Sequence, residues 1–319
     1  MLQKRLAQIS LAKQAVKGTP AAEATVQIGL LGGKVAGVEI SEEDLNPTSS
    51  TRVSQYVERT GVVPQTEFDF VCMPRSIGLL LLGACGNVVT TGAGPYVHTF
   101  TAGDDLPYLT AWGMFAGNHV RMPDCKVDEL ELSFDRAGAV KAKSKVLGLD
   151  LAFGAAPDLA ADAVERPIDG VIKSAGGLFE VDGAAAKVKS GTLKFTNSVE
   201  AVAVATQTLP DDVYPGLAVV DVSLTVVPAD LSAFRKALTG SAAGTVVSSD
   251  PYIGAMSLKF VMDAATDLVF AASNAALATA FPDADPAGGP AEVTIEGKVL
   301  APASGDPYSV VLRNAVESY

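Results

Sequence analysis

The segment DELELSF, residues 128–134, decides the fold class of this chain. Apolar and polar residues alternate along it, so Leu130 and Leu132 fall on one side while Glu129 and Glu131 fall on the other. A period of two is typical of a β-strand with one buried face and one exposed face. The segment therefore predicts a half-buried strand.

The same period occurs in other parts of the chain. It appears in TEFDF (66–70), where Glu67 and Asp69 share the polar side, and in VVDVSLTVV (219–227). Gly, Pro, Asp and Asn divide most of the chain into short segments of this kind, which is the pattern of antiparallel strands. We therefore expect a large antiparallel sheet.

A short repeated triplet suggests how these strands are connected. LSF at 132–134 is followed later by LKF at 193–195 and again at 258–260. Each triplet precedes a turn-prone stretch and a second apolar segment: AVKAKSKVLG, VEAVAVAT and TDLVFAAS respectively. The repeat predicts three β-hairpins of similar build.

Two segments have the signals of short helices. PRSIGLLLLGACG (74–86) has Pro in its first turn and ends at glycine, and PADLSAFRKALTG (228–240) begins with Pro and Asp and also ends at glycine. Together with the strands, they predict a mainly β protein, an antiparallel sandwich or barrel with one or two short flanking helices.

The chain divides into an arm and a main domain. Residues 1–25 are polar and alanine-rich and end near a Gly-Thr-Pro turn, so we expect an N-terminal arm followed by a β domain over 26–319. Residues 241–292 are rich in Ala, Asp, Gly and Pro. We expect any inserted loop or subdomain there.

Composition narrows the function. The formal net charge is −12 with a pI near 4.6, and Lys and Arg are scattered, which argues against a nucleic-acid binder. Charged residues make up only 19% of the chain, which suggests a surface largely covered by contacts. Cys72, Cys85 and Cys125 form no CxxC pair and predict free buried thiols. The longest apolar run, at 77–86, is too short to cross a bilayer, so we expect no membrane anchor.

The segment 96–122 contains both histidines, and we tested it for catalytic chemistry. His98 and His119 lie too far apart for an HxxxH or HExxH motif, although a mixed metal site with Asp104 stays open. Loop or surface histidines are the ordinary alternative. The chain also lacks a GxSxG motif and a phosphate-binding glycine loop. We therefore predict no enzyme activity and no cofactor.

The same segment has a more informative pattern. YVHTF predicts a strand, TAGDDLP a polar loop and YLTAWGMF a second strand, with Trp112 suited to a core or an interface. The order of these pieces resembles the tail tube, or major tail, proteins of long-tailed bacteriophages. The segments that share the resemblance are AKQAVKGTPAA (12–22), VDELELSFDRAGAVKAKSKVLG (127–148), DDVYPGLAVVDVSLTVVPADLSAFRKAL (211–238) and the closing PYSVVLRNAVESY.

The resemblance implies a structural subunit of a virion tail, assembled in the host cytoplasm. Six copies would form a ring, and rings would stack through arms and loops into a tube that conducts DNA without binding it specifically. The implied partners are further copies of the chain, a tape measure protein inside the tube, and terminator and tip proteins. The loop with Asp104 and Asp105 would be a ring-to-ring contact.

An acidic channel would repel DNA and let it slide. The candidate channel residues are Glu67, Asp69, Glu129 and Glu131, and a solvated strand face or a subunit interface is the alternative for each of them. Two other functions stay open at this point. One is another β-rich virion protein, such as a terminator, baseplate or decoration protein, and the other is a metal-dependent hydrolase.

Overall fold

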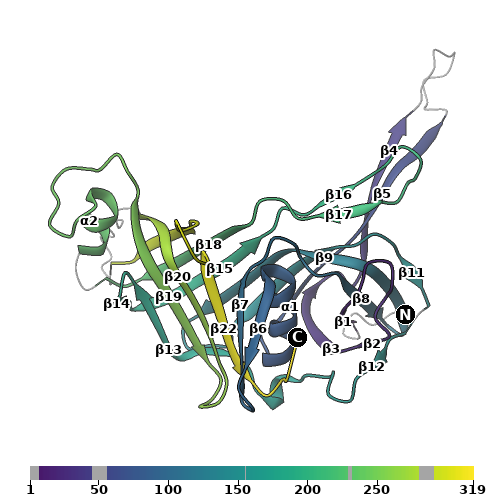
Figure 1. Cartoon of the computed structure of the whole chain (residues 1–319), viewed down its shortest axis with the longest axis horizontal. Coiled ribbons are helices and arrows are strands. Elements are labelled where there is room, and N and C mark those ends of the chain that lie inside the picture. Colours follow the sequence, from purple (N-terminus) through teal and green to yellow (C-terminus); the bar gives the residue numbers. More distant parts are fainter. Residues whose placement is uncertain (1–6, 45–55, 155, 229–231, 280–290) are drawn as a thin grey trace.

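The computed structural model describes residues 7–44, 56–154, 156–228, 232–279 and 291–319, and it confirms a mainly β fold with a large antiparallel sheet. Helices are few and short in the described chain (Figure 1). None of the described helices has the length and apolar character needed to cross a bilayer. The predicted fold class is therefore confirmed.

One part of the sheet closes on itself. Successive antiparallel pairings run from β9 through β10, β5, β3, β1 and β8 back to β9, which makes a barrel (Figure 1). Closure removes free edges from the strands that take part. The strands of the barrel are β1 (Ala7–Lys13), β3 (Val26–Gly33), β5 (Val57–Val71), β8 (Leu109–Phe115), β9 (Asn118–Asp135) and β10 (Lys141–Leu147).

The long strand β9 continues from the barrel into a sandwich. On its far side it pairs with β15, and the ladder proceeds through β18 and β21 to β20. β20 also pairs with β19 and β22, so it joins the two layers. These strands are β13 (Lys173–Val181), β15 (Val188–Thr196), β18 (Val219–Val226), β19 (Tyr252–Val261), β20 (Asp267–Thr279), β21 (Val293–Val299) and β22 (Tyr308–Asn314).

Aromatic rings fill the space between the layers of the sandwich. Phe134 of β9 stacks on Phe179 of β13 with ring centroids 5.0 Å apart, and Phe260 of β19 meets Phe134 edge-to-face, also at 5.0 Å. Burying each ring contributes about 1.5–3 kcal/mol, and well-oriented aromatic pairs add about 0.5–1.5 kcal/mol. This cluster holds the two layers together.

The predicted helix over 74–86 is confirmed as α1 (Pro74–Cys85), which packs between the barrel and strands β6 (Gly86–Thr91), β7 (Tyr96–Ala102) and β22 (Figure 1). Pro74 lies in its first turn, and Gly86 ends it with a φ of 91°. The Glu165 carboxylate accepts hydrogen bonds of 2.7 Å from the backbone N–H groups of Arg75 and Ser76. A distant acidic side chain thereby satisfies donors that α1 leaves free.

The second predicted helix, over 228–240, is present as α2 (Ser232–Thr239). Residues 229–231 of the predicted range lie outside the described residues. Gly240 follows the helix with a φ of 76°, which is the left-handed conformation that glycine adopts at a helix end. The predicted end of this helix is therefore confirmed.

Two of the three hairpins predicted from the repeated triplets exist. β9 pairs with β10, and β19 pairs with β20, as the repeat predicts. The middle hairpin is wrong, because β15 pairs with β18 and β9. The segment after it forms β16 (Glu200–Val202), which pairs with β17 (Asp212–Tyr214) instead. The triplet marks a strand but not its partner.

The segment predicted as an arm contributes a strand to the barrel. Residues 7–13 form β1, which pairs with β3 on one side and β8 on the other. An arm role in assembly stays a prediction for the remainder of 1–25. In the region 241–292, β19 and β20 belong to the main sheet, and residues 280–290 lie outside the described residues. An inserted subdomain there also stays a prediction.

The smaller elements lie at the periphery. A two-stranded hairpin of β4 (Gly37–Asp44) and the first half of β5 extends far from the body, and the β16–β17 hairpin runs toward its base (Figure 1). The backbone N–H of Val62 in β5 donates to the carbonyl of Thr208 between β16 and β17 at 2.8 Å. The other short elements are β2 (Glu23–Ala24), β11 (Ala152–Phe153), β12 (Asp158–Leu159), β14 (Ala184–Ala185) and a 3-10 turn at Pro167–Asp169.

Candidate functional site

A row of charged residues crosses the outer face of the sheet from β5 to β21. Each member is directly opposite the next in the strand register, and neighbours in register on antiparallel strands share a face. Negative and positive side chains alternate along the whole row. In order, the row, called the charge row below, consists of Asp69, Lys143, Glu131, Lys194, Asp221 and Lys298.

The two lysines nearest the barrel form ion pairs with acids of the neighbouring row. Lys143 of β10 pairs with Glu67 of β5, and Lys194 of β15 pairs with Glu129 of β9 at 3.1 Å. The hydrogen bond from Lys143 lowers the pKa of Glu67, and the same bond raises the pKa of Lys143. Asp69 and Glu131 raise the pKa of Lys143 further. The carboxylates therefore lie within the field of interleaved ammonium groups.

The predicted acidic faces of β5 and β9 lie on either side of a strand that contributes lysines. The four predicted acids do lie on one continuous face, but β10 runs between their strands and places Lys141, Lys143 and Lys145 there. The alternating lysines of KAKSK (141–145) were visible in the sequence as one polar strand face. Their register against the acids was not, because local alternation says nothing about which strand lies alongside.

The charge row crosses a shallow hollow in the sheet. The hollow lies over β9, β15, β18, β21 and β20. Charged and small polar side chains line most of it, and Ala276 and Ala278 of β20 form one wall. This surface has the shape and polarity of a face that stays in contact with water or with a highly charged partner.

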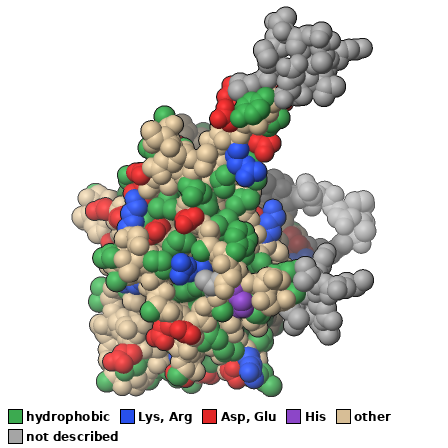
Figure 2. All heavy atoms as spheres, turned by 90° about the vertical axis from the view of Figure 1, so that its right-hand side faces the viewer, with side chains coloured by type: hydrophobic (Ala, Val, Ile, Leu, Met, Phe, Trp, Pro, Cys, Tyr) green, Lys and Arg blue, Asp and Glu red, His purple; other side chains and the backbone are tan. Residues whose placement is uncertain are grey.

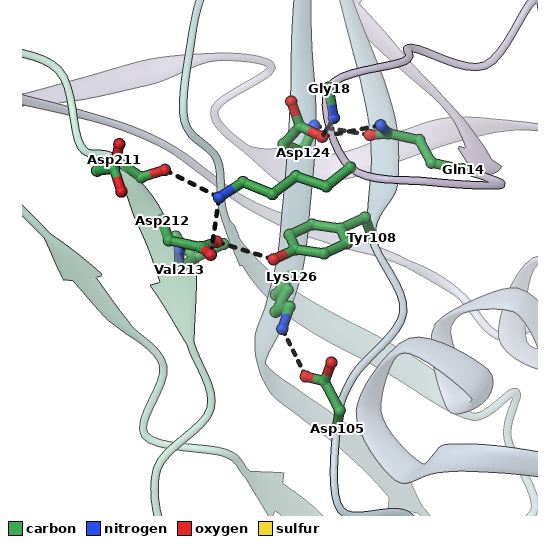
Figure 3. A network of polar contacts seen from close by, with 10 residues as sticks. Gln14, Gly18, Asp105, Tyr108, Asp124, Lys126, Asp211, Asp212 and Val213 are labelled. Carbon is green, nitrogen blue, oxygen red and sulfur yellow. Dashed lines mark hydrogen bonds and ion pairs between the residues drawn. The ribbon is translucent and has the colours of Figure 1, made fainter.

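The loop with Asp104 and Asp105 is exposed, and Asp105 is tied to the barrel (Figure 3). The ammonium group of Lys126, whose side chain is 2% exposed, donates to Asp105 at 2.6 Å. It also lies 4.5 Å from the centroid of the Tyr108 ring, where the electron-rich face attracts a cation. Part of the Asp105 carboxylate therefore fixes the loop in the monomer.

The polar network continues from Tyr108 to two other segments (Figure 3). The Tyr108 hydroxyl donates to Asp212 of β17 at 2.8 Å, and Lys17 forms an ion pair with Asp212 at 2.7 Å. Burial would raise the pKa of Asp212, but the hydrogen bonds from Lys17 and Tyr108 outweigh it and lower the pKa. The network thus anchors the β16–β17 hairpin and the segment after β1.

Asp124 of β9 also holds the segment after β1, residues 14–18. Its carboxylate accepts hydrogen bonds from the Gly18 N–H at 2.7 Å and from the Gln14 side chain at 3.0 Å, and Gln14 in turn accepts from the Asp124 N–H (Figure 3). No sequence pattern predicts this network, because its members come from distant segments. It explains how residues 14–18 are positioned after β1 ends.

Trp112 and His98 are buried in the monomer. Trp112 is 3% exposed and packs with Ala12, Ala24 and Ala21. The ring of His98 is fully used: Nδ1 lies 2.8 Å from the Thr90 hydroxyl and Nε2 lies 2.9 Å from the Val316 carbonyl oxygen. Burial lowers the pKa of His98 and favours the neutral ring. Its environment is that of a core histidine.

We find no metal centre in the part of the chain that the structure describes. There, no group of three or more His, Cys, Asp or Glu side chains has a geometry suited to a metal ion. The site considered for His98, His119 and Asp104 is therefore not assembled. Cys72, Cys85 and Cys125 are free and buried, as predicted, and burial raises the pKa of the Cys85 thiol to about 12.

Much of the remaining surface is neither strongly charged nor strongly polar. Figure 2 shows one such face, where acidic and basic side chains are interspersed and hydrophobic side chains lie between them. Single large apolar residues are normal on a surface, but several here are extensively exposed. They include Phe153 at 80%, Ile168 at 88% and Leu217 at 78% exposure.

The projecting hairpin adds a further apolar contribution. Val38 and Ile40 of β4 are each 42% exposed, and Tyr56 and Val57 at the start of the described β5 segment are 56% and 49% exposed. β4 pairs with β5, and nearly all of its residues are exposed. A hairpin of this kind is marginally stable in water by itself.

These features define a class of protein: a β-rich domain that combines a barrel and a sandwich with a projecting hairpin and exposed apolar side chains. A family model described as phage tail tube protein matches residues 4–306, nearly the whole chain, and the chain therefore belongs to that family. It is a structural component of a virion tail. The search of curated proteins gave no match.

Proposed function

We propose that this chain is the repeating subunit of a bacteriophage tail tube, in which six copies form a ring and rings stack around a channel that conducts DNA from capsid to host. The observation that carries the stacked assembly is the projecting β4–β5 hairpin. It extends from the body into space that the monomer leaves empty (Figure 1). An element of this shape is suited to reach a second ring.

The hairpin supports the proposal through its exposed apolar residues. Val38 and Ile40 lie on β4 away from the core, and their side chains are exposed to solvent in the monomer. Burying apolar surface contributes about 25 cal/mol per Å², so a contact that covers both residues stabilises a stack measurably. A head-to-tail contact of this kind uses two different surfaces, and it therefore extends into a filament.

The channel is assigned to the face that contains the charge row. It is polar, continuous across the sheet and hollowed over β18 and β21. Glu67, Asp69, Glu129 and Glu131 would then face DNA in transit, and no specific binding is expected from it. A tape measure protein would occupy the same channel before ejection, and terminator and tip proteins would contact the two tube ends.

The remaining contacts are assigned to loops. Asp104 and the free part of the Asp105 carboxylate are exposed beside the barrel, where a neighbouring ring would meet them. The part of residues 1–25 outside β1 would contribute an arm, and Trp112 packs against Ala12, Ala21 and Ala24 on the face of β8 opposite the main core. Assembly in the host cytoplasm is consistent with three reduced cysteines.

Negative-stain electron microscopy of the purified chain tests the proposal. Stacked rings with a central channel are the expected result, and a cross-section gives the ring symmetry. Isolated particles under every assembly condition would contradict it and favour another virion role. The variant Ile40→Ser should form rings but shorter stacks, with the melting temperature of the monomer unchanged. Val246→Ser, which alters a valine that is 78% exposed in the loop before β19, is the matched control.

A further inference from the structure

The charge row is balanced, whereas the whole chain is not. The chain has 36 acidic and 24 basic residues, an excess of acids. The charge row alternates strictly from Asp69 to Lys298, with one lysine for each carboxylate. The acidic excess therefore lies outside the charge row, in part on β4 with Glu39, Glu42 and Glu43 and in part at Glu296, which lines the same hollow.

The adjacent row also alternates in sign near the barrel, where one lysine lies between two acids. Glu67, Lys145 and Glu129 are opposite one another in register, and Lys145 forms an ion pair with Asp128 at 2.8 Å. Glu129 pairs with Lys194 of the charge row at 3.1 Å. Positive and negative groups on this face are thus paired along two directions of the sheet.

Alternation on this scale has a physical consequence. Neighbouring strands are about 4.8 Å apart, so the spacing of opposite charges along the row is shorter than the Debye length of about 8 Å at physiological salt. Their fields cancel at distances comparable to that spacing. A phosphate chain that passes over the row meets neither a sustained attraction nor a sustained repulsion.

We propose that the charge row makes the channel face electrostatically neutral toward duplex DNA, so that the phosphate backbone slides over it without retention. This inference rests on the proposed function, because it requires the face to line the channel. It replaces repulsion by a net acidic wall with cancellation by paired charges. A surplus of lysines would hold phosphates through counterion release, and the interleaved acids prevent that.

Opposite charges on adjacent strands also stabilise a sheet, by roughly 0.2–1 kcal/mol for each pair. A purely structural role predicts that breaking the pairs lowers stability and leaves DNA behaviour unchanged. The two explanations are distinguished by one variant that changes the net charge of the face and another that changes only the pairing of its charges. Glu131→Gln with Asp221→Asn removes two negative charges and leaves the row with a net positive charge, whereas Glu131→Lys with Lys194→Glu keeps the net charge of the row but places like charges opposite each other on neighbouring strands.

The first measurement locates the face in assembled tubes. The variant Lys194→Cys supplies a reactive thiol, since the three native cysteines are buried. A small maleimide should label it in both monomers and tubes, and a maleimide carried by a protein too large for the channel should label monomers alone. Labelling of tubes by the large reagent would place the face on the outside of the tube and overturn the inference, but it would not contradict the proposed function. Failure to form any tube would overturn the proposed function as well.

The second measurement is the retention of a short fluorescent duplex DNA by open tubes at about 50 to 200 mM salt. Wild-type tubes and tubes of Glu131→Lys with Lys194→Glu should show no retention that depends on salt. Tubes of Glu131→Gln with Asp221→Asn should retain duplex at low salt, and two phosphate contacts at a slope of about −0.9 each predict an approximately tenfold loss over that range.

Two results of this measurement would overturn the inference. If duplex enters wild-type tubes more readily as salt rises, the face is acidic in its effect and the charges do not cancel. If the doubly neutralised tubes behave as wild type does, DNA does not sense the charge row. Thermal melting of each variant monomer reports the structural contribution separately.

Discussion

The ion pair between Asp105 and Lys126 yields a prediction that depends on which partner is removed. The Lys126 side chain is 2% exposed, whereas that of Asp105 is 71% exposed. Replacing Asp105 by Ala leaves a buried ammonium group that has lost its carboxylate partner and keeps its contact with the face of Tyr108. Replacing Lys126 by Met removes the buried charge and leaves a carboxylate that water can solvate. The two single variants should therefore differ in stability.

The magnitudes follow from the two environments. Removing one partner of a fully buried pair costs about 3–5 kcal/mol, and an exposed pair contributes about 0–1 kcal/mol. With one partner in each environment, we expect Asp105→Ala to lower the free energy of unfolding by about 2 kcal/mol. Lys126→Met should cost less than about 1 kcal/mol, because Met retains most of the packing of the lysine stem. The double variant should resemble Lys126→Met.

The assay is urea unfolding of the monomer for wild type, both single variants and the double variant. A double-mutant cycle removes the effect that Asp105→Ala has on its other hydrogen bond, from the Leu106 N–H at 2.8 Å. A coupling energy of about 1–2 kcal/mol is expected. If Lys126→Met destabilises the chain as much as Asp105→Ala does, the asymmetry argument is refuted, and Lys126 stabilises the barrel chiefly through its own packing.

Three further predictions concern the core and the proposed channel. Gly83→Ala should lower the free energy of unfolding by up to about 2 kcal/mol in urea titrations, because an added Cβ would lie 2.5 Å from Val127 Cγ2 and this crowding exceeds the gain in helix propensity. Adding Val127→Ala should relieve the crowding. As the pH falls below the unfolded pKa of 6.5, the free energy of unfolding should fall by up to about 1.4 kcal/mol per pH unit, because burial lowers the pKa of His98 in the folded chain and the unfolded chain takes up the proton first. His98→Gln should remove this component from melting curves measured between pH 7 and 5. Charge reversal at Glu129 and Glu131 should slow DNA ejection from phage particles while tubes still assemble, and an unchanged rate would show that these residues do not face the channel.

The sequence predicted strands and helices well where one face of an element is buried. The segment at 128–134 alternates because Leu130 and Leu132 face the core, and the structure confirms it as part of β9. The segment at 7–13 lies in the polar, alanine-rich stretch 1–25, and the sequence therefore predicts an arm there instead of a strand. Ser10 and Ala12 are buried together with Ile9 and Leu11, so both faces of β1 are covered and no polar face marks the strand.

Partners of strands were harder to predict than strands. β9 spans Asn118–Asp135 and pairs with β8 in its first half and with β10 and β15 in its second half. Its sequence contains no signal for the change of partner, because pairing depends on packing between distant segments. The wrong hairpin after β15 has the same cause, since β16 follows it in sequence but β18 lies beside it.

The charge of the candidate site could not be predicted from the sequence for the same reason. The sequence placed Glu67, Asp69, Glu129 and Glu131 on polar strand faces, which the register supports. It did not place the lysines of β10 between them, and the sign of the whole face depends on that strand. The polar network around Lys126 was missed for a similar reason, because its members meet only after the barrel closes.

Net charge is therefore a poor guide to the channel of this protein. The value of −12 describes the chain, but a passing phosphate responds only to groups within about a Debye length. On the charge row these groups cancel, whereas β4 has Glu39, Glu42 and Glu43 on a hairpin far from it. If the hairpin meets the next ring, repulsion between its acids and those of a neighbour is screened by salt. Stack length should then depend on salt concentration, while retention of DNA by the channel should not.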